Sequence, residues 1–288
     1  MQLNAYPEIF LVGAPKCGTT SIFNFFNQHP EIFVPNIKEP HYFSTPEVAN
    51  NFYNVKLVSD PAEYVGLYAS CEKGLKRADC SPSYLSYSKA CSRIYEVNPD
   101  AKILAILRDP IKRAISHYLM DVRFGVQNVD LIECLNFPDL HPMSYREYVT
   151  NGLYSSQIQN YLDLFPKKNV MILIFDDLEK DTESTMRKIF EFLEVDPFVF
   201  IDYRKRANTG AQHRYNFIRN FISSEKWQTL RHLLPKTIRH IMRQTLLKAN
   251  PRIPNQKLVT GKLLNIFQSD IVNLTKMLDR DLSNWLQH

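Results

Sequence analysis

The chain lacks any long apolar segment and has few cysteines. No apolar run approaches the roughly 20 residues that a membrane-spanning helix needs. The first residues, Met-Gln-Leu-Asn-Ala-Tyr-Pro-Glu, lack the basic and then apolar order of a signal peptide. The chain has five cysteines, an odd number, and no two of them form a Cys-x-x-Cys pair. This argues against a disulfide framework or a zinc site. We therefore expect a cytoplasmic protein that needs no metal and has no stable membrane insertion.

Acidic residues are nearly absent from one stretch of the chain. Residues 204–262 contain fourteen lysines and arginines and a single acid, Glu225, so this stretch carries +13. The formal net charge of the whole chain is +5, which leaves −8 for the remainder. Such a basic stretch attracts anions, whether nucleic acid, a membrane surface or a polyanionic cofactor. A solvated helical face is the alternative interpretation.

The apolar residues come in short runs that predict an α/β fold. Apolar runs bounded by polar residues are typical of buried parallel strands, and the sequence between them has helical periodicity. Strands that alternate with helices predict a P-loop-like, three-layer α/β/α domain with a central, mostly parallel sheet. Its ligands should bind at the carboxyl ends of the strands. Strands are expected at 9–12, 103–107 and 170–175, and helices at 19–28, 111–120, 155–165 and 182–193.

The chain length favours one domain over residues 1–288, with a helical and basic C-terminal subregion from about 211 to 288. Within that subregion apolar residues recur helically over 215–248, where Pro235 forces a break, and over 261–286.

Two internal segments have no such periodicity. Residues 35–65 and 121–150 are rich in proline, asparagine and aromatic residues. We predict that both are irregular loops flanking the functional site.

A glycine-bounded loop follows the first predicted strand. It opens at Gly13 and closes at Gly18, and the residues after it begin an amphipathic helix. Backbone amides and the positive end of a helix dipole make such a loop an anion site. In nucleotide triphosphatases a lysine follows the second glycine, but here Thr19 holds that place and Lys16 lies inside the loop. The loop therefore suits one phosphate beside a transferable group better than a magnesium-bound triphosphate.

Arg108 comes directly after the second predicted strand. Asp109 and Pro110 then begin a helix, since proline is tolerated in the first turn, where a missing N–H costs little. Ser116 lies eight residues after Arg108, so the guanidinium and the hydroxyl can grip one phosphate. A magnesium-dependent P-loop enzyme would place an acidic residue at the end of such a strand. The motif therefore argues against a nucleotide kinase or hydrolase.

These two motifs, about ninety residues apart, resemble the phosphate-binding segments of a known family. Residues 15–20 are similar to the 5′-phosphosulfate loop (Pro-Lys-x-Gly-Thr-Thr) of sulfotransferases that use 3′-phosphoadenosine 5′-phosphosulfate (PAPS). Residues 108–118 are similar to the 3′-phosphate motif (Arg-Asp-Pro…Arg-x-x-Ser-x-Tyr) of the same family. The resemblance implies PAPS as donor, 3′-phosphoadenosine 5′-phosphate (PAP) as product, and Lys16 as the donor to the bridging oxygen. The cofactor-binding residues it implies are Pro15, Lys16, Cys17, Gly18, Thr19, Thr20, Ser21, Arg108 and Ser116.

The segment Pro-Asn-Ile-Lys-Glu-Pro-His-Tyr-Phe, residues 35–43, resembles a run after the first helix in the heparan-sulfate-like and bacterial branches of the family. There the glutamate acts as general base, and Glu39 matches it. An acceptor that attacks sulfur must lose a proton, so a proton acceptor belongs within hydrogen-bond reach. Lys38 would compensate charge beside the sulfonate, and His41 is the rival base, because imidazole titrates near neutrality. A loop salt bridge is the alternative role of Glu39.

Three further segments resemble family patterns. Residues 78–84 resemble a segment that lines the acceptor, although Cys80 stands where heparan-type members carry a catalytic lysine. Residues 151–154 resemble a Gly-x-Tyr element near the nucleotide, and residues 206–214 resemble a late segment that closes over it. The resemblance implies that the acceptor contacts Asp79, Ser81 and Tyr84, in addition to Glu39 and His41, and that the cofactor contacts Tyr154, Arg206, Asn208 and Arg214. A core position is the alternative for Tyr154.

The resemblance implies a stand-alone, bacterial-type sulfotransferase acting on a small-molecule acceptor. The sulfuryl group would pass to a hydroxyl, or to an amine or carbamate nitrogen, of a secondary metabolite such as a guanidinium alkaloid toxin. A glycolipid or carbohydrate acceptor is the alternative, and a P-loop nucleotide kinase is a more distant one. A non-catalytic module that uses the basic stretch to bind an anionic partner is the rival from another class, but we expect no nucleic-acid partner. The oligomeric state is not predicted.

Overall fold

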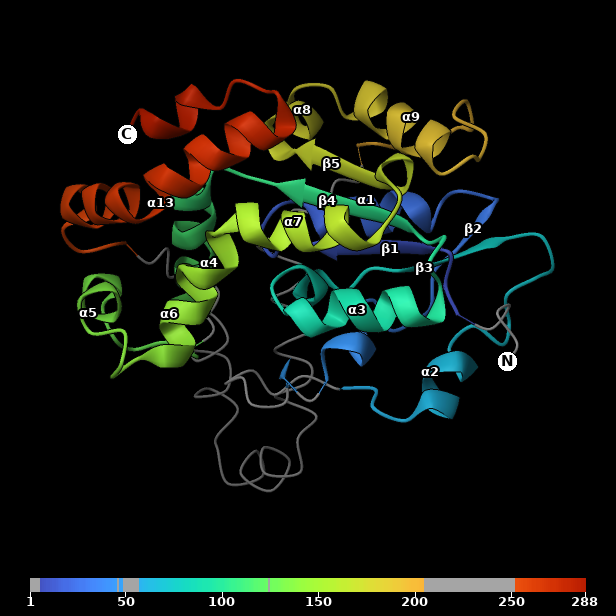
Figure 1. Cartoon of the computed structure of the whole chain (residues 1–288), viewed down its shortest axis with the longest axis horizontal. Coiled ribbons are helices and arrows are strands. Elements are labelled where there is room, and N and C mark those ends of the chain that lie inside the picture. The colour runs from blue at the N-terminus through green and yellow to red at the C-terminus, as the bar shows by residue number, and fades with distance from the viewer. Residues whose placement is uncertain (1–5, 46, 49–56, 124, 205–251) are drawn as a thin grey trace, which may run out of the picture.

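The computed structural model describes residues 6–45, 47–48, 57–123, 125–204 and 252–288. In this part of the chain five parallel strands form one sheet in the order β2-β3-β1-β4-β5 (Figure 1). The strands are β1 (Ile9–Gly13), β2 (Ile32–Phe33), β3 (Lys76–Asp79), β4 (Lys102–Leu107) and β5 (Val170–Ile174).

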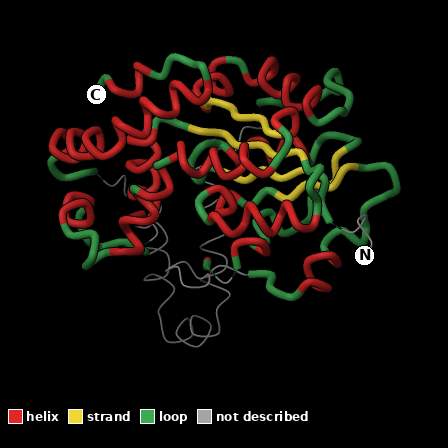
Figure 2. Tube along the Cα trace, in the orientation of Figure 1, coloured by secondary structure: helices red, strands yellow, loops and turns green. Residues whose placement is uncertain are grey.

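Helices connect the strands and cover both faces of the sheet. The helices α3 and α7 lie across the face turned to the viewer in Figure 1, and α1 lies behind the sheet beside α9, where Phe26 meets Phe190. The predicted three-layer α/β/α fold with a parallel sheet is confirmed (Figure 2). The described helices are α1 (Thr19–Phe26), α2 (Pro61–Gly66), α3 (Ser88–Val97), α4 (Pro110–Arg123), α5 (Leu131–Asn136), α6 (Pro142–Tyr148), α7 (Tyr154–Leu164), α8 (Phe175–Lys180), α9 (Thr182–Phe192) and α13 (Gln256–Leu278). The short 3-10 helices are η2 (Tyr42–Ser44), η4 (Pro82–Leu85), η5 (Thr150–Gly152), η6 (Lys167–Asn169) and η7 (Ser283–Leu286).

The sequence predicted the central strands and missed those on one side of them. β1 and β4 are buried throughout their apolar runs, as strands covered on both faces must be. β3 reads Lys-Arg-Ala-Asp and has no apolar run, and β2 has two residues. β3 is held instead by polar partners, because Arg77 pairs with Glu8, the residue just before β1. Charged strands of this kind escape an analysis based on apolar runs.

Several predicted boundaries are corrected by the structure. The segment 121–150 is not irregular, since it contains the end of α4 and the helices α5 and α6, and 35–65 contains η2 and α2. Phe175 begins α8 and is not part of β5. The last helix ends at Leu278, where Asp279 takes a left-handed conformation (φ 48°), and a separate 3-10 turn follows. The predicted helices of 215–248 lie outside the described residues.

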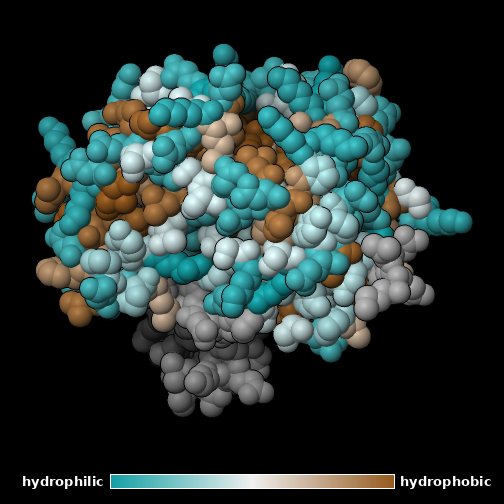
Figure 3. Space-filling view, in the orientation of Figure 1, coloured by the Kyte–Doolittle hydropathy of each residue, from teal (hydrophilic) through white to brown (hydrophobic). Residues whose placement is uncertain are grey.

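The polarity of the surface and the order of the strands both bear on where a ligand can bind. Most of the face shown in Figure 3 is hydrophilic, with apolar side chains gathered mainly toward its left. Within the described residues, no helix combines the length and apolarity needed to cross a membrane. The chain leaves β1 toward β2 on one side of the sheet and leaves β4 toward β5 on the other. Ligands of open α/β sheets bind at such a switch point, beyond the carboxyl ends of the strands.

Candidate active site

The loops that follow β1 and β4 meet at the switch point of the sheet. The Ala14 N–H donates to the Ile106 carbonyl at 2.8 Å, and Arg108 Nη1 donates to the Lys16 carbonyl at 3.3 Å. The loop turns through two residues with positive φ, Lys16 (71°) and Gly18 (90°). The side chains of Lys16 and Arg108, which the sequence places 92 residues apart, therefore lie together.

A glycine is required at position 18 by both conformation and space. Its φ of 90° suits glycine, and a Cβ there would lie 2.8 Å from the ring of Phe175. The same ring faces the guanidinium of Arg108, whose Cζ is 4.9 Å from the ring centroid. Phe175 therefore supports the loop and Arg108 at once. This role was not predicted, because the apolar run 170–175 placed Phe175 in a strand.

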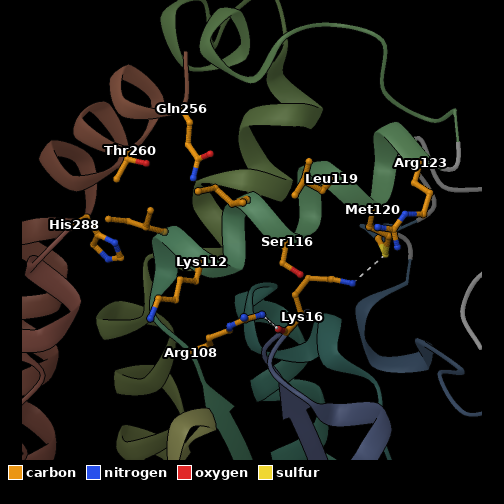
Figure 4. A pocket seen from close by; sticks show the side chains of 12 residues that line it. Lys16, Arg108, Lys112, Ser116, Leu119, Met120, Arg123, Gln256, Thr260 and His288 are labelled. Atoms are coloured by element: carbon orange, nitrogen blue, oxygen red, sulfur yellow. Dashed lines mark hydrogen bonds between the residues drawn. The ribbon is translucent and has the colours of Figure 1, made fainter. Parts of the chain in front are cut away.

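A pocket of about 480 Å³ opens beside these two loops. The three residues predicted to bind opposite ends of one cofactor, Lys16, Arg108 and Ser116, all line it (Figure 4). Lys112 and Arg123 add two more cations, and none of the lining residues that the structure describes is an aspartate or a glutamate. The remaining lining residues come from α4 and from the C-terminal part of the chain, and they are Ile111, Ile115, Leu119, Met120, Gln256, Thr260 and His288. A cation-rich lining of this kind fits a ligand with several negative charges.

The amine of Lys16 has a lowered pKa. Burial lowers the pKa of its amine from 10.5 to about 8, against the attraction of Asp121, and the charges of Arg108 and Arg123 lower it further. The amine donates to Met120 Sδ at 3.2 Å. A thioether is a weak acceptor, so this lysine holds a proton that it can offer to a better acceptor.

The start of α4 is fixed by Asp109. Its Oδ1 accepts from the N–H groups of Ile111 (2.9 Å) and Lys112 (3.2 Å), and its Oδ2 lies 2.9 Å from Nε2 of His288. Asp109 therefore sets the direction in which α4 presents Ser116. No role was predicted for His288, because nothing in the local sequence links this residue to α4.

The side chains of Cys17 and Tyr154 lie beneath the loop and are fully buried. The Tyr154 hydroxyl donates to the Arg108 carbonyl at 3.0 Å and lies 3.8 Å from Cys17 Sγ, which also donates to the Pro15 carbonyl. Burial raises the pKa of the Cys17 thiol to about 11, so it is not a reactive thiolate. Tyr154 thus supports the backbone of Arg108 from the core.

The predicted phosphate loop continues into α1. Gly18 precedes the helix, and its carbonyl accepts from the Ser21 N–H at 2.9 Å. Thr19, buried, and Thr20 and Ser21, partly exposed, form the first turn. The structure therefore places these three predicted residues at the positive end of an α-helix.

The predicted base lies on the loop after β2. Lys38 Nζ donates to Glu39 Oε1, so the alternative salt bridge is present, and His41 Nε2 lies 3.7 Å from Glu39 Oε2. His41 is buried, its Nδ1 is 2.8 Å from Ser83 Oγ, and burial lowers the pKa of its imidazole. Because parallel strands end at one edge of the sheet, this loop and the phosphate loop emerge at the same edge.

Asp79, Ser81 and Tyr84 are placed differently from the expectation. They were predicted to line the acceptor site, but their side chains are closed off from solvent, with exposed fractions of 0%. The hydroxyls of Ser81 and Tyr84 both donate to the Asp79 carboxylate. A direct contact between these three side chains and an acceptor does not fit this geometry, because the carboxylate is already satisfied by internal donors. Cys80 is also buried.

The remaining predicted residues, Arg206, Asn208 and Arg214, lie outside the described residues, as does most of the basic stretch. Arg113, which belongs to the second motif, is buried and holds the carbonyls of Glu147 (3.0 Å) and Tyr148 (2.5 Å). It therefore ties α4 to α6 and takes no part in the pocket lining.

The chain matches the sulfotransferase domain family over residues 6–243. It is 25% identical to carbohydrate sulfotransferase 15 of Rattus norvegicus, over 68% of this chain and 45% of that protein. It is also 25% identical to heparan sulfate glucosamine 3-O-sulfotransferase 6 of Mus musculus, over 77% of this chain and 60% of that protein. The chain thus spans about half the length of the curated relatives it matches.

Solved sulfotransferase structures share this fold over nearly the whole chain. A sulfotransferase from Alicyclobacillus acidocaldarius superposes with a TM-score of 0.73 and 27% identity, covering 97% of this chain and 98% of that one. The mouse sulfotransferase SULT7A1, solved in complex with PAP, shares the fold, with a TM-score of 0.51 and 17% identity over 93% of this chain and 86% of that one. The family predicted from the two phosphate motifs, whose enzymes take their sulfuryl group from PAPS, is confirmed, and the chain belongs to the sulfotransferase family.

Proposed function

We propose that this protein transfers a sulfuryl group from PAPS to a hydroxyl, or to an amine or carbamate nitrogen, of a small-molecule acceptor. One observation carries the proposal. Lys16, Arg108 and Ser116 come from two distant motifs and line one cation-rich pocket at the switch point of the sheet. PAPS carries one phosphate at the 3′ position and another at the 5′ position of its ribose, and a site with separated cationic groups suits it.

The proposed donor site uses the residues of both motifs. Arg108 and Ser116 hold the 3′-phosphate, the guanidinium through charge-assisted hydrogen bonds. The phosphate loop and the first turn of α1 hold the 5′-phosphate through backbone amides and hydroxyls. Tyr154 keeps the Arg108 backbone in place from below. The full set of proposed donor-site residues is Pro15, Lys16, Cys17, Gly18, Thr19, Thr20, Ser21, Arg108, Ser116, Tyr154, Arg206, Asn208 and Arg214.

The proposed chemistry needs one proton donor and one proton acceptor from the chain. PAPS, when bound, supplies an activated sulfuryl group joined to a phosphate that leaves. Lys16 stabilises the negative charge that grows on the leaving oxygen, an interaction made mainly in the transition state. Glu39 accepts the proton of the attacking group, Lys38 compensates charge beside it, and His41 is the alternative base.

The acceptor is proposed to be a small molecule. The lysine that the heparan-type members carry is replaced by Cys80, whose buried thiol cannot take its place because burial raises its pKa far above neutrality. A carbohydrate acceptor is the second candidate, because the curated relatives named above are carbohydrate and heparan sulfate sulfotransferases. Release of PAP from PAPS, measured across a panel of small alcohols, amines, guanidinium compounds and oligosaccharides, separates the two.

Calorimetric titration with PAP tests the donor site. We expect tight binding without magnesium, and a loss of about 10²- to 10⁴-fold in Arg108→Ala, because two charge-assisted hydrogen bonds contribute about 1.5–3 kcal/mol each. Arg187→Ala is the matched control, since it removes an arginine from α9 that pairs with Glu183 on the surface. No binding of PAP by the wild type, together with magnesium-dependent binding of ATP, would instead identify a nucleotide kinase.

A further inference from the structure

Asp79 ends β3 as a fully buried carboxylate served by three hydroxyl groups. Ser81 Oγ donates to Oδ1 at 2.7 Å, and the hydroxyls of Tyr64 and Tyr84 donate to Oδ2 at 2.7 and 2.8 Å. Burying a carboxylate is costly unless it is hydrogen-bonded. The three hydroxyl donors therefore stabilise the buried charge of Asp79. The chemistry proposed above gives this carboxylate no role.

Two of the three hydroxyls also accept hydrogen bonds from the loop that carries the proposed base. The His41 N–H donates to Ser81 Oγ at 3.2 Å, and the Phe43 N–H donates to the Tyr84 hydroxyl at 3.4 Å. Each hydroxyl has one proton and an ionised carboxylate can only accept. The hydroxyl protons of Ser81 and Tyr84 therefore both point at Asp79. The lone pairs of the two hydroxyl oxygens are then free to accept the backbone N–H groups of His41 and Phe43.

The loop needs such support at this place. His41 has a φ of 57°, a conformation that non-glycine residues rarely adopt. Glu39 lies two residues before it, with 31% of its side chain exposed, and its carboxylate contacts Lys38 and His41. Its position therefore depends on how firmly the backbone at residues 41–43 is held.

We propose that Asp79 is a positioning residue, which acts through the hydroxyls of Ser81 and Tyr84 to fix the loop of Glu39 for proton abstraction. The inference rests on the proposed function, in which Glu39 accepts the acceptor's proton. It assigns Asp79 to the support of the base, in place of contact with the acceptor.

Tyr64 supplies a matched control for this role. Its hydroxyl donates to the same carboxylate at 2.7 Å. Unlike the hydroxyls of Ser81 and Tyr84, it does not accept a hydrogen bond from the backbone of residues 41–43. Its ring stacks on Tyr42 with centroids 4.2 Å apart, and a phenylalanine keeps that contact. Tyr64→Phe and Tyr84→Phe therefore each remove one buried hydroxyl from Asp79, and only the second cuts a connection to the loop.

The experiment compares Asp79→Asn, Ser81→Ala/Tyr84→Phe and Tyr64→Phe with the wild type. Hydrogen exchange is followed in the peptide that covers residues 38–45, PAP affinity is followed by calorimetry, and turnover is followed as PAP release from PAPS with a panel acceptor or with water. In the double variant the amides of His41 and Phe43 should each exchange about 5- to 10-fold faster, as expected when each loses one hydrogen bond of about 1 kcal/mol. Its kcat should fall about 10- to 100-fold, because a misplaced catalytic group costs that much.

Affinity for PAP should change less than about threefold in every variant, and Tyr64→Phe should match the wild type in exchange and in kcat. Asp79→Asn should behave like the double variant, because its amide group donates where the carboxylate accepts. The proposal is overturned if Tyr64→Phe and the double variant behave alike in exchange and kcat, whether both change or neither does. Failure of the wild type to bind PAP would count against the proposed function and would leave the comparison of loop exchange standing.

Discussion

Replacing Lys16 by methionine should make the protein more stable while it removes the proposed proton donor. The amine is buried in the pocket, and burial lowers its pKa from 10.5 to about 8. Below pH 8 the folded protein therefore holds a charge that its surroundings disfavour. Methionine has a similar length and no charge, and it would lie against the thioether of Met120, which now accepts from the lysine.

The size of the effect follows from the lowered pKa of Lys16. At 1.36 kcal/mol per pH unit, the change from 10.5 to about 8 disfavours the charged form by about 3 kcal/mol. This cost is fully present below pH 8. Between pH 8 and 10.5 the unfolded chain binds more protons than the folded one, so wild-type stability rises with pH. The advantage of the methionine variant should therefore be about 3 kcal/mol at pH 7 and close to zero above pH 10.5.

Urea denaturation of both proteins at pH 7 and at pH 10 measures this difference. Lys112→Met is the control, because Lys112 lines the same pocket with more than half of its side chain exposed, and its replacement should leave stability nearly unchanged. Turnover should fall about 10²- to 10³-fold in Lys16→Met, as for the loss of one preorganised transition-state donor. A variant that is less stable than the wild type at pH 7, or whose stability advantage does not shrink as the pH rises, would contradict a buried and disfavoured charge at Lys16.

Two further predictions concern the phosphate loop and the base. Gly18→Ala should lose about 1–2 kcal/mol from its left-handed conformation and more from the contact with the Phe175 ring, and should weaken PAP binding. Gly74→Ala, with a φ of 98° and open space around it, isolates the conformational part in the same denaturation assay. Glu39→Gln should lower kcat by about 10²-fold or more, as for loss of a general base, and His41→Gln by less than about tenfold. The opposite order in steady-state rates would assign the base to His41.

Local sequence was sufficient for the elements that carry the phosphate motifs. β1 contains the apolar run 9–12 and β4 the apolar run 103–107 because both faces of these strands are covered, so short apolar runs identify them. The glycine-bounded loop and the spacing from Arg108 to Ser116 are also local. A strand, the turn after it and the helix that follows depend on neighbouring residues, and such patterns are visible in one sequence.

The polar parts of the fold were not predictable in this way. β3 lacks an apolar run, and its charged residues are satisfied by partners elsewhere, such as Glu8 for Arg77. From the sequence, Asp79 was expected to be exposed and to contact the acceptor. Only the packing of α2 and η4 around it shows that hydroxyl groups from both elements hold it in the interior.

The family, the parallel α/β fold and the residues of the two phosphate motifs can be recognised from the sequence, because short contiguous segments encode them. The distant residues that complete the pocket depend on how the chain packs in three dimensions. Phe175, which follows β5, packs against Gly18. Three residues from the C-terminal part of the chain, Gln256, Thr260 and His288, also line the pocket. These contacts join segments more than a hundred residues apart, and they exist only once β1, β4 and β5 have brought their carboxyl ends to one edge.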